Sequence, residues 1–226
     1  MKHQNIELVI NFSGGKDSSA MLAYLCEHYP QVKKRIIMAD TGWEHKDAVE
    51  WCKKIVALMG LQLDVCRNEN KTFLSMIRKR RKFPSATTRQ CTSDLKRGPI
   101  QTWIRRNIKS TTIINCMGMR AQESRSRGKL NPLKRNKALT NSKRTVWDWL
   151  PIHHWNEMEV LDYLEKRNIP LHPIYRHLRR FSCRICIFMN DHDLSEVKQY
   201  DPEAYRIIAD LEKEINFSMR PGKYLS

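Results

Sequence analysis

The stretch IELVINFSGGKDS, residues 6–18, places a short apolar run directly before a pair of glycines. An apolar run of this length that ends at glycines is typical of a buried β-strand. Residues 18–28 follow with apolar side chains at helical spacing. The stretch therefore predicts a strand, a tight turn and a helix, in that order.

The turn carries the residue types of a phosphate-binding loop, namely Ser13, Gly14, Gly15, Lys16, Asp17 and Ser18. Paired glycines let backbone amides turn inward around phosphate oxygens, and the helix N-terminus behind them adds unpaired N–H groups. Lys16 offers a mobile positive charge, and Asp17 orients the loop or holds Mg²⁺. The spacing G-x-x-x-x-G-K is absent, so this is not a Walker A loop.

The rest of the chain alternates between strand and helix patterns. Strands are expected over residues 35–40, 61–66, 111–117 and 146–152, and helices over 46–59, 73–82, 92 or 93–107, 156–167 and 201–216. Such alternation predicts an α/β fold with an open, mostly parallel sheet and helices on both faces. We expect a nucleotide-binding domain over residues 1–152 and a small helical, cysteine-bearing region over 153–226. Residues 124–145 are polar and basic, and we expect a mobile loop there.

The positive charge is concentrated in one segment of the chain. Of the 41 Lys and Arg, 21 lie in residues 71–145 with only two acids, so this basic segment carries +19 and the remainder −2. A single nucleotide needs about three or four cations, whereas a polyanion matches a face of this charge. We expect a nucleic acid, tRNA or DNA, at Arg78, Lys79, Arg80 and Arg81. A solvated basic surface is the alternative.

Seven cysteines are present, and two of them form the pair Cys183-x-x-Cys186. This spacing puts two thiols within reach of one metal ion or cluster. The chain has no signal-peptide pattern and no apolar run of the ~18 residues that a membrane span requires. We therefore expect a cytoplasmic protein without membrane contact, in which the cysteines do not form a disulfide framework.

Several motifs resemble one known family. Ser13 to Ser18 resembles the signature of the PP-loop ATP pyrophosphatases and their sulfonucleotide reductase relatives. Asp40-Thr41-Gly42, the stretch from Gly118 to Ser124, Leu150-Pro151-Ile152, and His172-Pro173-Ile174-Tyr175 before the cysteine pair resemble motifs of the phosphoadenosine phosphosulfate (PAPS) reductase-like branch, in the same order. The resemblance runs from about residue 8 to about residue 190. It implies the PP-loop, adenine nucleotide alpha hydrolase-like fold.

The resemblance also implies an adenine-nucleotide site, for ATP or for PAPS or APS as substrate. Lys16, Asp17 and Arg120 are the expected catalytic residues, and a planar guanidinium at Arg120 suits phosphate or sulfate oxygens. The expected nucleotide-binding set joins the phosphate loop to Asp40, Thr41, Gly42, Gly118, Arg120, Ser124 and Arg125. Arg127 is a further candidate for the same role.

In the iron–sulfur reductases of this family a Cys-Cys pair precedes a basic run, and here the corresponding residues are Gln90-Cys91. The resemblance thus implies three ligands, Cys91, Cys183 and Cys186, for a 4Fe–4S cluster. Since four thiolates normally hold such a cluster, three would leave one iron open, as in the cluster-dependent tRNA thiolases. Cys116 is a candidate fourth ligand. A zinc site with His177 or His192 as the fourth ligand, and bare or redox-active thiols, are the rival interpretations.

The reductases of the family attack sulfur with a thiolate in a C-terminal tail, and no cysteine follows Cys186 in this sequence. We therefore expect ATP-dependent adenylyl activation of a nucleic-acid atom followed by sulfur insertion, similar in outline to the DNA phosphorothioation sulfurtransferases. A sulfur donor or reductant protein is the expected partner. The sequence leaves open whether the protein forms a homo-oligomer. The alternatives are a sulfonucleotide reductase that releases sulfite, and a non-catalytic nucleotide- or nucleic-acid-binding subunit.

Overall fold

The computed structural model describes residues 5–181 and 183–225, which fall into two units. The first, here called the sheet unit, comprises Met1–Met38, Ala48–Val65 and Gln101–His172. The second, here called the cysteine unit, comprises Ala39–Asp47, Cys66–Ile100 and Pro173–Ser226. The expected domain boundary at residue 152 stays a prediction.

The described residues form a six-stranded sheet with the order β3-β2-β1-β4-β6-β5. Its strands are β1 Ile6–Asn11, β2 Lys33–Asp40, β3 Leu63–Arg67, β4 Thr112–Met117, β5 Leu133–Arg135 and β6 Thr145–Trp149. β1 pairs in parallel with β2 and β4, and β4 pairs in parallel with β6. The expected α/β fold with a mostly parallel sheet is confirmed.

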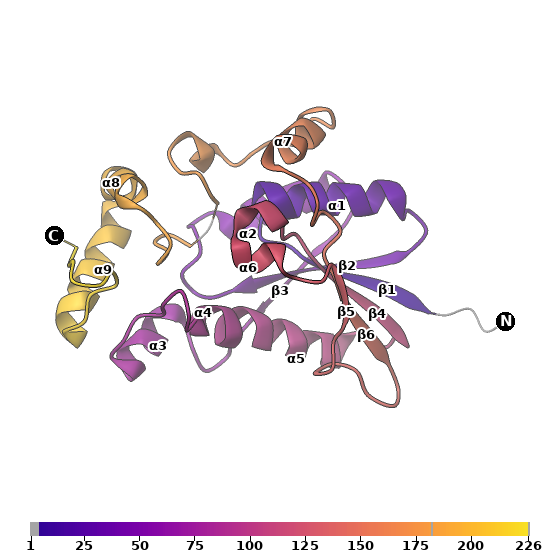
Figure 1. Ribbon diagram of the computed structural model, residues 1–226, viewed down its shortest axis with the longest axis horizontal. Helices are drawn as coiled ribbons and strands as arrows, with labels where there is room; N and C mark the ends of the chain where they lie inside the picture. The colour runs from indigo at the N-terminus through magenta and orange to yellow at the C-terminus, as the bar shows by residue number, and fades with distance from the viewer. Residues whose placement is uncertain (1–4, 182, 226) are drawn as a thin grey trace. The chain divides into compact units, whose positions relative to one another are not determined.

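β1 lies inside the sheet, and this explains its unbroken apolar run. Leu8, Val9 and Ile10 are at most 4% exposed, because strands flank β1 on both edges and helices cover both faces. The covering helices include α1 Lys16–His28, α2 Ala48–Ala57, α5 Gly98–Asn107 and α7 Glu157–Glu165. α1 packs against α7, and α1 and α5 lie on opposite sides of the sheet (Figure 1).

The expectation that residues 124–145 lack regular structure is wrong. They contain α6 Arg125–Gly128 and β5, which pairs antiparallel with β6 through the register Leu133↔Trp149 and Arg135↔Trp147. All three side chains of β5 are exposed, so no apolar alternation marks it in the sequence. Its place is fixed instead by backbone pairing at the sheet edge.

The cysteine unit is mainly helical. It contains α3 Phe73–Arg80, α4 Gln90–Thr92, the π-helix η1 Ser93–Arg97, the 3₁₀-helix η3 Pro173–Arg176, α8 Asp191–Tyr200 and α9 Pro202–Ile215. α8 packs against α9, and it begins at a capping box of Asn190 and Asp193 that our sequence interpretation missed. The single helix expected up to residue 107 is instead divided into α4, η1 and α5.

Among the described residues, no helix has the length and apolar character needed to cross a membrane.

Candidate functional site

The phosphate loop is closed by its own hydrogen bonds. Ser18 Oγ donates to the Gly15 carbonyl at 2.9 Å and accepts from the Ser13 backbone N–H at 3.3 Å. Gly14 has a φ of 75°, a conformation that glycine adopts without strain, and Trp51 Nε1 donates to its carbonyl at 3.0 Å. The N-cap residue of α1 is Gly15, which offers no side-chain cap, and a helix N-terminus of this kind favours an anion.

Lys16 is the buried cation of this loop. Its residue is 7% exposed, and Nζ lies 3.0 Å from Oε1 of Glu157 at the start of α7. A buried ammonium is stable only with such a partner. A phosphate oxygen at the loop would therefore compete with the Glu157 carboxylate for the same charge.

Arg120 is fixed beside the first turn of α1. It is 4% exposed, its Nε donates to Asp17 Oδ1 at 2.5 Å, and its Nη1 donates to Gln122 Oε1 at 2.7 Å. The Asp17 carboxylate thus orients Arg120, a role that the sequence did not suggest. Its two expected roles, orienting the loop and binding Mg²⁺, stay predictions.

Gly118 allows the end of β4 to approach α1 closely. A Cβ added at this glycine would lie 3.0 Å from the Asp17 carbonyl oxygen and 3.1 Å from Ser18 Cα. Both neighbours are backbone atoms that cannot rotate away, so any side chain here would displace the phosphate loop. This close approach is what brings Arg120, two residues later, to Asp17.

Ser124 and the arginines that follow it belong to α6. Ser124 Oγ accepts from the Arg127 backbone N–H at 3.2 Å and caps the helix, whereas Arg125 is exposed. Arg127 forms an ion pair with Glu123, which also accepts from the Arg120 backbone N–H at 2.9 Å. The charge of Arg127 is therefore neutralised by Glu123. Arg125 is thus the better candidate of the two for contact with a nucleotide phosphate.

Asp40, Thr41 and Gly42 form a rigid turn at the start of the cysteine unit. Asp40 Oδ1 accepts from the Gly42 backbone N–H at 2.8 Å, and the Thr41 hydroxyl donates to Glu44 Oε1 at 2.9 Å. Gly42 has a φ of 72°, and an added Cβ would meet Thr72 Cβ at 3.2 Å. The expected contact of this turn with adenosine stays a prediction.

The three expected metal ligands, Cys91, Cys183 and Cys186, all belong to the cysteine unit. Burial raises the pKa of the Cys183 thiol well above its ordinary value, and the charges of Glu44, Cys186 and Cys91 raise it further. Burial also raises the pKa of Cys186, and Cys91 adds to this effect. Burial of these thiols creates surroundings in which thiolates require a metal or a cation.

Lys96 supplies a cation at this position. Its Nζ lies 3.2 Å from Glu44 Oε1. Burial alone lowers the pKa of Lys96, but the charges of Glu44, Cys183 and Cys186 raise it above its ordinary value. The Lys96 side chain therefore stays protonated in the electrostatic surroundings of the cysteine trio, defined here as Cys91, Cys183 and Cys186.

The trio could hold either a single zinc ion or a cluster. Zinc at about 2.3 Å from each sulfur would require the sulfur atoms to lie about 3.8 Å apart, whereas a cluster binds its ligands at different irons. All seven cysteines lie in the described part of the chain, and none of them is in a disulfide bond.

The candidate fourth ligands have other surroundings. Cys116 is buried in β4, where burial raises its pKa, and its thiol donates to the Ile114 carbonyl at 3.7 Å. His177 Nδ1 lies 3.1 Å from Glu196 Oε2, and its ring stacks on Tyr200. His192 is exposed on α8. Nothing about these three side chains marks one of them as a ligand.

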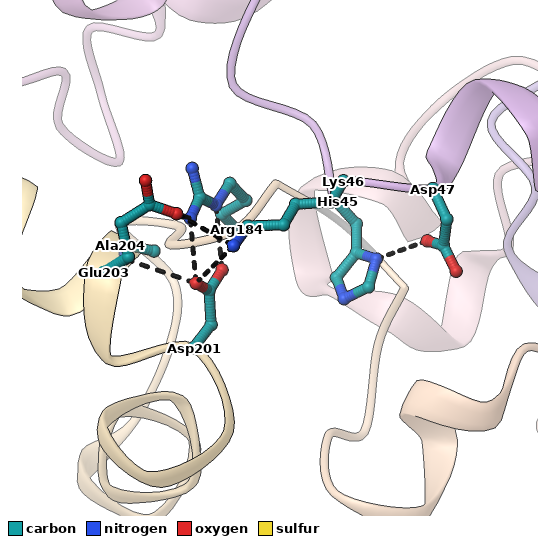
Figure 2. Close-up of polar contacts among 7 residues, drawn as sticks. All are labelled: His45, Lys46, Asp47, Arg184, Asp201, Glu203 and Ala204. Carbon is teal, nitrogen blue, oxygen red and sulfur yellow. Dashed lines mark hydrogen bonds and ion pairs between the residues drawn. The ribbon is translucent and has the colours of Figure 1, made fainter.

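The Cys183–Cys186 segment is anchored by the residue between its cysteines. Figure 2 shows Arg184 reaching Asp201 and Glu203, with Nη2 at 2.8 Å from Asp201 Oδ1 and 2.7 Å from Glu203 Oε2. Lys46 Nζ joins this network at 2.8 Å from Glu203. The segment is also tied by its backbone, since the Arg184 N–H donates to the Trp43 carbonyl at 3.1 Å.

The expected nucleic-acid residues lie on and after α3. Arg78 Nε pairs with Glu214 Oε2 at 3.0 Å, so part of its charge is neutralised within the unit. Lys79, Arg80 and Arg81 are exposed, and Arg81 ends the helix with a φ of 52°. A nucleic-acid role for these four residues stays a prediction.

Sequence reasoning missed four residues that shape the site, Glu157, Glu44, Lys96 and Arg184. The first two are isolated acids whose partners come from distant segments, so no local pattern reveals them. Arg184 and Lys96 lie within or just after motifs that were singled out only for their cysteines.

The chain is similar to several known proteins in sequence and in fold. The sequence profile of the phosphoadenosine phosphosulfate reductase domain matches residues 7–188. The chain is 25% identical, over 96% of its length, to an uncharacterized protein of Methanocaldococcus jannaschii, and spans half of that relative's length. It is 23% identical to the phosphoadenosine 5'-phosphosulfate reductase of Proteus mirabilis, over 77% of this chain and 68% of the relative.

Two solved structures share the fold. The U34-tRNA thiolase of Methanococcus maripaludis with its [4Fe-4S] cluster matches 99% of this chain and 78% of its own, with a TM-score of 0.56 and 20% identity. The phosphoadenylyl-sulfate reductase of Candida auris matches 75% of this chain and 76% of its own, with a TM-score of 0.50 and 14% identity.

Proposed function

Because the chain belongs to the phosphoadenosine phosphosulfate reductase domain family, we propose that it is an enzyme that binds an adenine nucleotide at its phosphate loop. We further propose that it uses ATP to activate an atom of a nucleic acid and then replaces that atom with sulfur. An iron–sulfur cluster at Cys91, Cys183 and Cys186 is part of this proposal.

The observation that carries the proposal is the cysteine trio. Two segments distant in sequence bring three thiols together in one unit, and Gln90 stands beside Cys91 in place of a fourth. A cluster held by three thiolates has one iron open to a further ligand, and it would supply a position for the sulfur to be transferred. The tRNA thiolase that shares the fold was solved with such a cofactor, which supports this interpretation.

The chain's own residues would bind and orient the nucleotide. The first N–H groups of α1 and the Lys16 ammonium would hold phosphate oxygens, and Arg120, fixed by Asp17, would neutralise charge that develops at the α-phosphorus. Attack by the acceptor oxygen on this phosphorus yields an adenylylated acceptor and pyrophosphate. Hydrosulfide from a sulfur donor then displaces AMP, so no electrons are gained or lost overall.

Sulfonucleotide reduction is the second candidate. It is supported by the Proteus mirabilis relative and by the Candida auris structure, both of which are named as reductases. In this case Lys16 and Arg120 would hold the phosphosulfate, and a thiol outside the cysteine trio would have to attack sulfur.

Labelled ATP, given to anaerobically prepared protein with and without tRNA or duplex DNA, separates the two candidates. We expect pyrophosphate release only with nucleic acid, because the acceptor must be oriented before attack. Lys16→Ala should weaken ATP binding by ~1.5–3 kcal/mol, the value of a charge-assisted contact. Sulfite release from PAPS with a thiol reductant, unaffected by nucleic acid, would establish the reductase instead.

A further inference from the structure

A polar groove in the cysteine unit has no role in the site described above. It has a volume of about 350 Å³ and is lined by Thr87, Thr88, Arg89, Gln90, Thr92, Ser93 and Arg97. Two of these side chains are cationic, and the others offer hydroxyl or amide groups. No carboxylate and no apolar side chain belongs to the lining.

The groove is built on an ordered frame. The Ser85 N–H donates to the Thr88 carbonyl at 3.1 Å, and the Thr88 N–H donates to Ser85 Oγ at 3.0 Å, so the loop closes on itself. Directly after it, the Ser93 N–H donates to the Arg89 carbonyl at 3.1 Å at the start of the helical run. Threonine hydroxyls from the loop and side chains from α4 and η1 thus share one groove.

The positive charge of the groove is not neutralised by acids. Across residues 5–181 and 183–225, neither Arg89 nor Arg97 forms an ion pair with a carboxylate. Arg89 lies over the Phe188 ring at 5.1 Å, and Arg97 is exposed. The acid next in sequence to the lining, Asp94, is bound to Lys71 Nζ at 3.1 Å. Two guanidinium groups are therefore available to an anion.

The chemistry of the lining selects the ligand. The two guanidinium groups match the non-bridging oxygens of a phosphate, and the threonine hydroxyls offer further donors. The Ser93 hydroxyl is engaged elsewhere, since it donates to Asp94 Oδ1 at 2.8 Å. No aromatic ring belongs to the lining, so its two guanidinium groups are the features that define its ligand. A phosphate group is the ligand that these groups fit best.

The surroundings favour a polyanion over a single phosphate. Lys79, Arg80 and Arg81 are exposed in the same unit. Arg80 is close enough to Asp94 to help lower the pKa of that carboxyl, after the larger effects of Ser93 and Lys71. Basic side chains therefore continue from α3 toward the groove and could contact successive phosphates.

We propose that this groove binds a backbone phosphate of the nucleic-acid acceptor and positions the acceptor beside Cys91, whose sequence neighbours Gln90 and Thr92 both line it. This inference rests on the proposed function, since it gives the acceptor a place next to the cysteine trio. A 3'-phosphate of a small nucleotide offers the same oxyanion, and the experiment below separates the two sources.

The test compares Arg97→Gln with the control Arg206→Gln, an exposed arginine of α9 in the same unit. Binding of labelled tRNA, single-stranded DNA and 3'-phosphoadenosine 5'-phosphate is measured over a range of salt concentrations, without ATP or sulfur donor. We expect Arg97→Gln to weaken nucleic-acid binding roughly tenfold, regardless of sequence. The slope of log K against log salt should fall by about 0.7–0.9, as for one lost phosphate contact. Arg206→Gln should bind like the wild type.

Equal nucleic-acid affinity and salt slope in wild type and Arg97→Gln overturns the proposal. It is also overturned if only 3'-phosphoadenosine 5'-phosphate binding depends on Arg97, because the groove then serves a small nucleotide. Adding Arg89→Gln should weaken binding further if both guanidinium groups hold the phosphate. Since neither ATP nor sulfur enters these measurements, failure of sulfur transfer in the ATP assay stays distinguishable from failure of the groove.

Discussion

Arg184 donates to both carboxylate oxygens of Asp201, from Nε and Nη2, each at 2.8 Å. The two side chains are only 12% and 7% exposed. Arg184 lies between the cysteines of the pair, and Asp201 caps α9 by accepting from the Ala204 N–H at 3.3 Å. A single bidentate ion pair thus ties the cysteine segment to the start of a helix.

Replacing Arg184 should lower the unfolding free energy of the cysteine unit, because Arg184 supports the fold and takes no part in the proposed reaction. Arg184→Gln leaves the nearly buried Asp201 carboxylate without its main partner, which costs about 3 kcal/mol of unfolding free energy. Urea denaturation of apoprotein measures this loss. The matched control is Arg180→Gln, an exposed arginine of the same segment, which should change stability by less than ~0.5 kcal/mol. Equal stability of the two variants would mean that backbone contacts alone hold the segment.

The same ion pair predicts a dependence of stability on acid. Burial alone raises the pKa of Asp201, but the hydrogen bonds and charge of Arg184 lower it below its ordinary value of about 3.9. A carboxyl whose pKa is lower in the folded state stabilises the fold fully above that value, and the contribution is lost as pH falls through the folded-state pKa. The gap in unfolding free energy between wild type and Asp201→Asn should therefore shrink below about pH 4. A gap that stays constant down to the acid transition would contradict the pairing.

Gly118 offers a test of the phosphate loop. In Gly118→Ala the new Cβ would lie 3.0 Å from the Asp17 carbonyl oxygen, so the loop must shift. Overpacking of this kind costs about 1–3 kcal/mol, and we expect ATP affinity to fall as well. Gly128→Ala is the control, because its Cβ would meet the Ala121 carbonyl oxygen at an ordinary 3.6 Å. Unchanged ATP binding in Gly118→Ala would show that the loop tolerates displacement or is not the nucleotide site.

Glu157 should compete with the nucleotide. Its carboxylate holds the Lys16 ammonium at 3.0 Å and is 54% exposed, so the ion pair is worth at most about 1 kcal/mol. Glu157→Gln should therefore tighten ATP binding by up to about fivefold, measured by calorimetry. Glu165→Gln removes the same charge from an exposed position of the same helix and should leave affinity unchanged. Weaker ATP binding in Glu157→Gln would instead indicate that this carboxylate helps to orient Lys16 for the nucleotide.

The parts of the fold that follow from local pattern could be read from the sequence. β1 and α1 are examples, because an apolar run, a Gly-Gly turn and helical spacing each act within a few residues. β5 could not be found in this way, since its three side chains are exposed and its pairing with β6 is made by the backbone. The π-helix η1 was missed because one extra residue per turn leaves no clear mark in the side-chain pattern.

The candidate site likewise has parts that the sequence predicts and parts that only the structure reveals. The phosphate loop and the Cys183–Cys186 pair are short local motifs, and the resemblance to a family predicts them, together with Cys91, residue by residue. The charges that support them come from remote segments, as with Glu44 at Lys96, Glu157 at Lys16, and Asp201 at Arg184. Such pairs are set by tertiary packing, so one sequence without a structure carries no signal for them.

Cys91, Cys183 and Cys186 should hold iron. Variants of these cysteines, compared with a variant of the buried Cys116, test this expectation. Protein prepared without oxygen from iron-rich medium should be brown and contain about four irons per chain, because a cubane cluster is the expected group. Cys183→Ser and Cys91→Ser should lose the colour and most of the iron, since each removes one of three ligands. Cys116→Ala should keep both, because Cys116 is buried in β4. Stoichiometric zinc without iron would favour the rival metal. Loss of iron in Cys116→Ala, with Cys91→Ser unchanged, would show that the third ligand was assigned to the wrong segment.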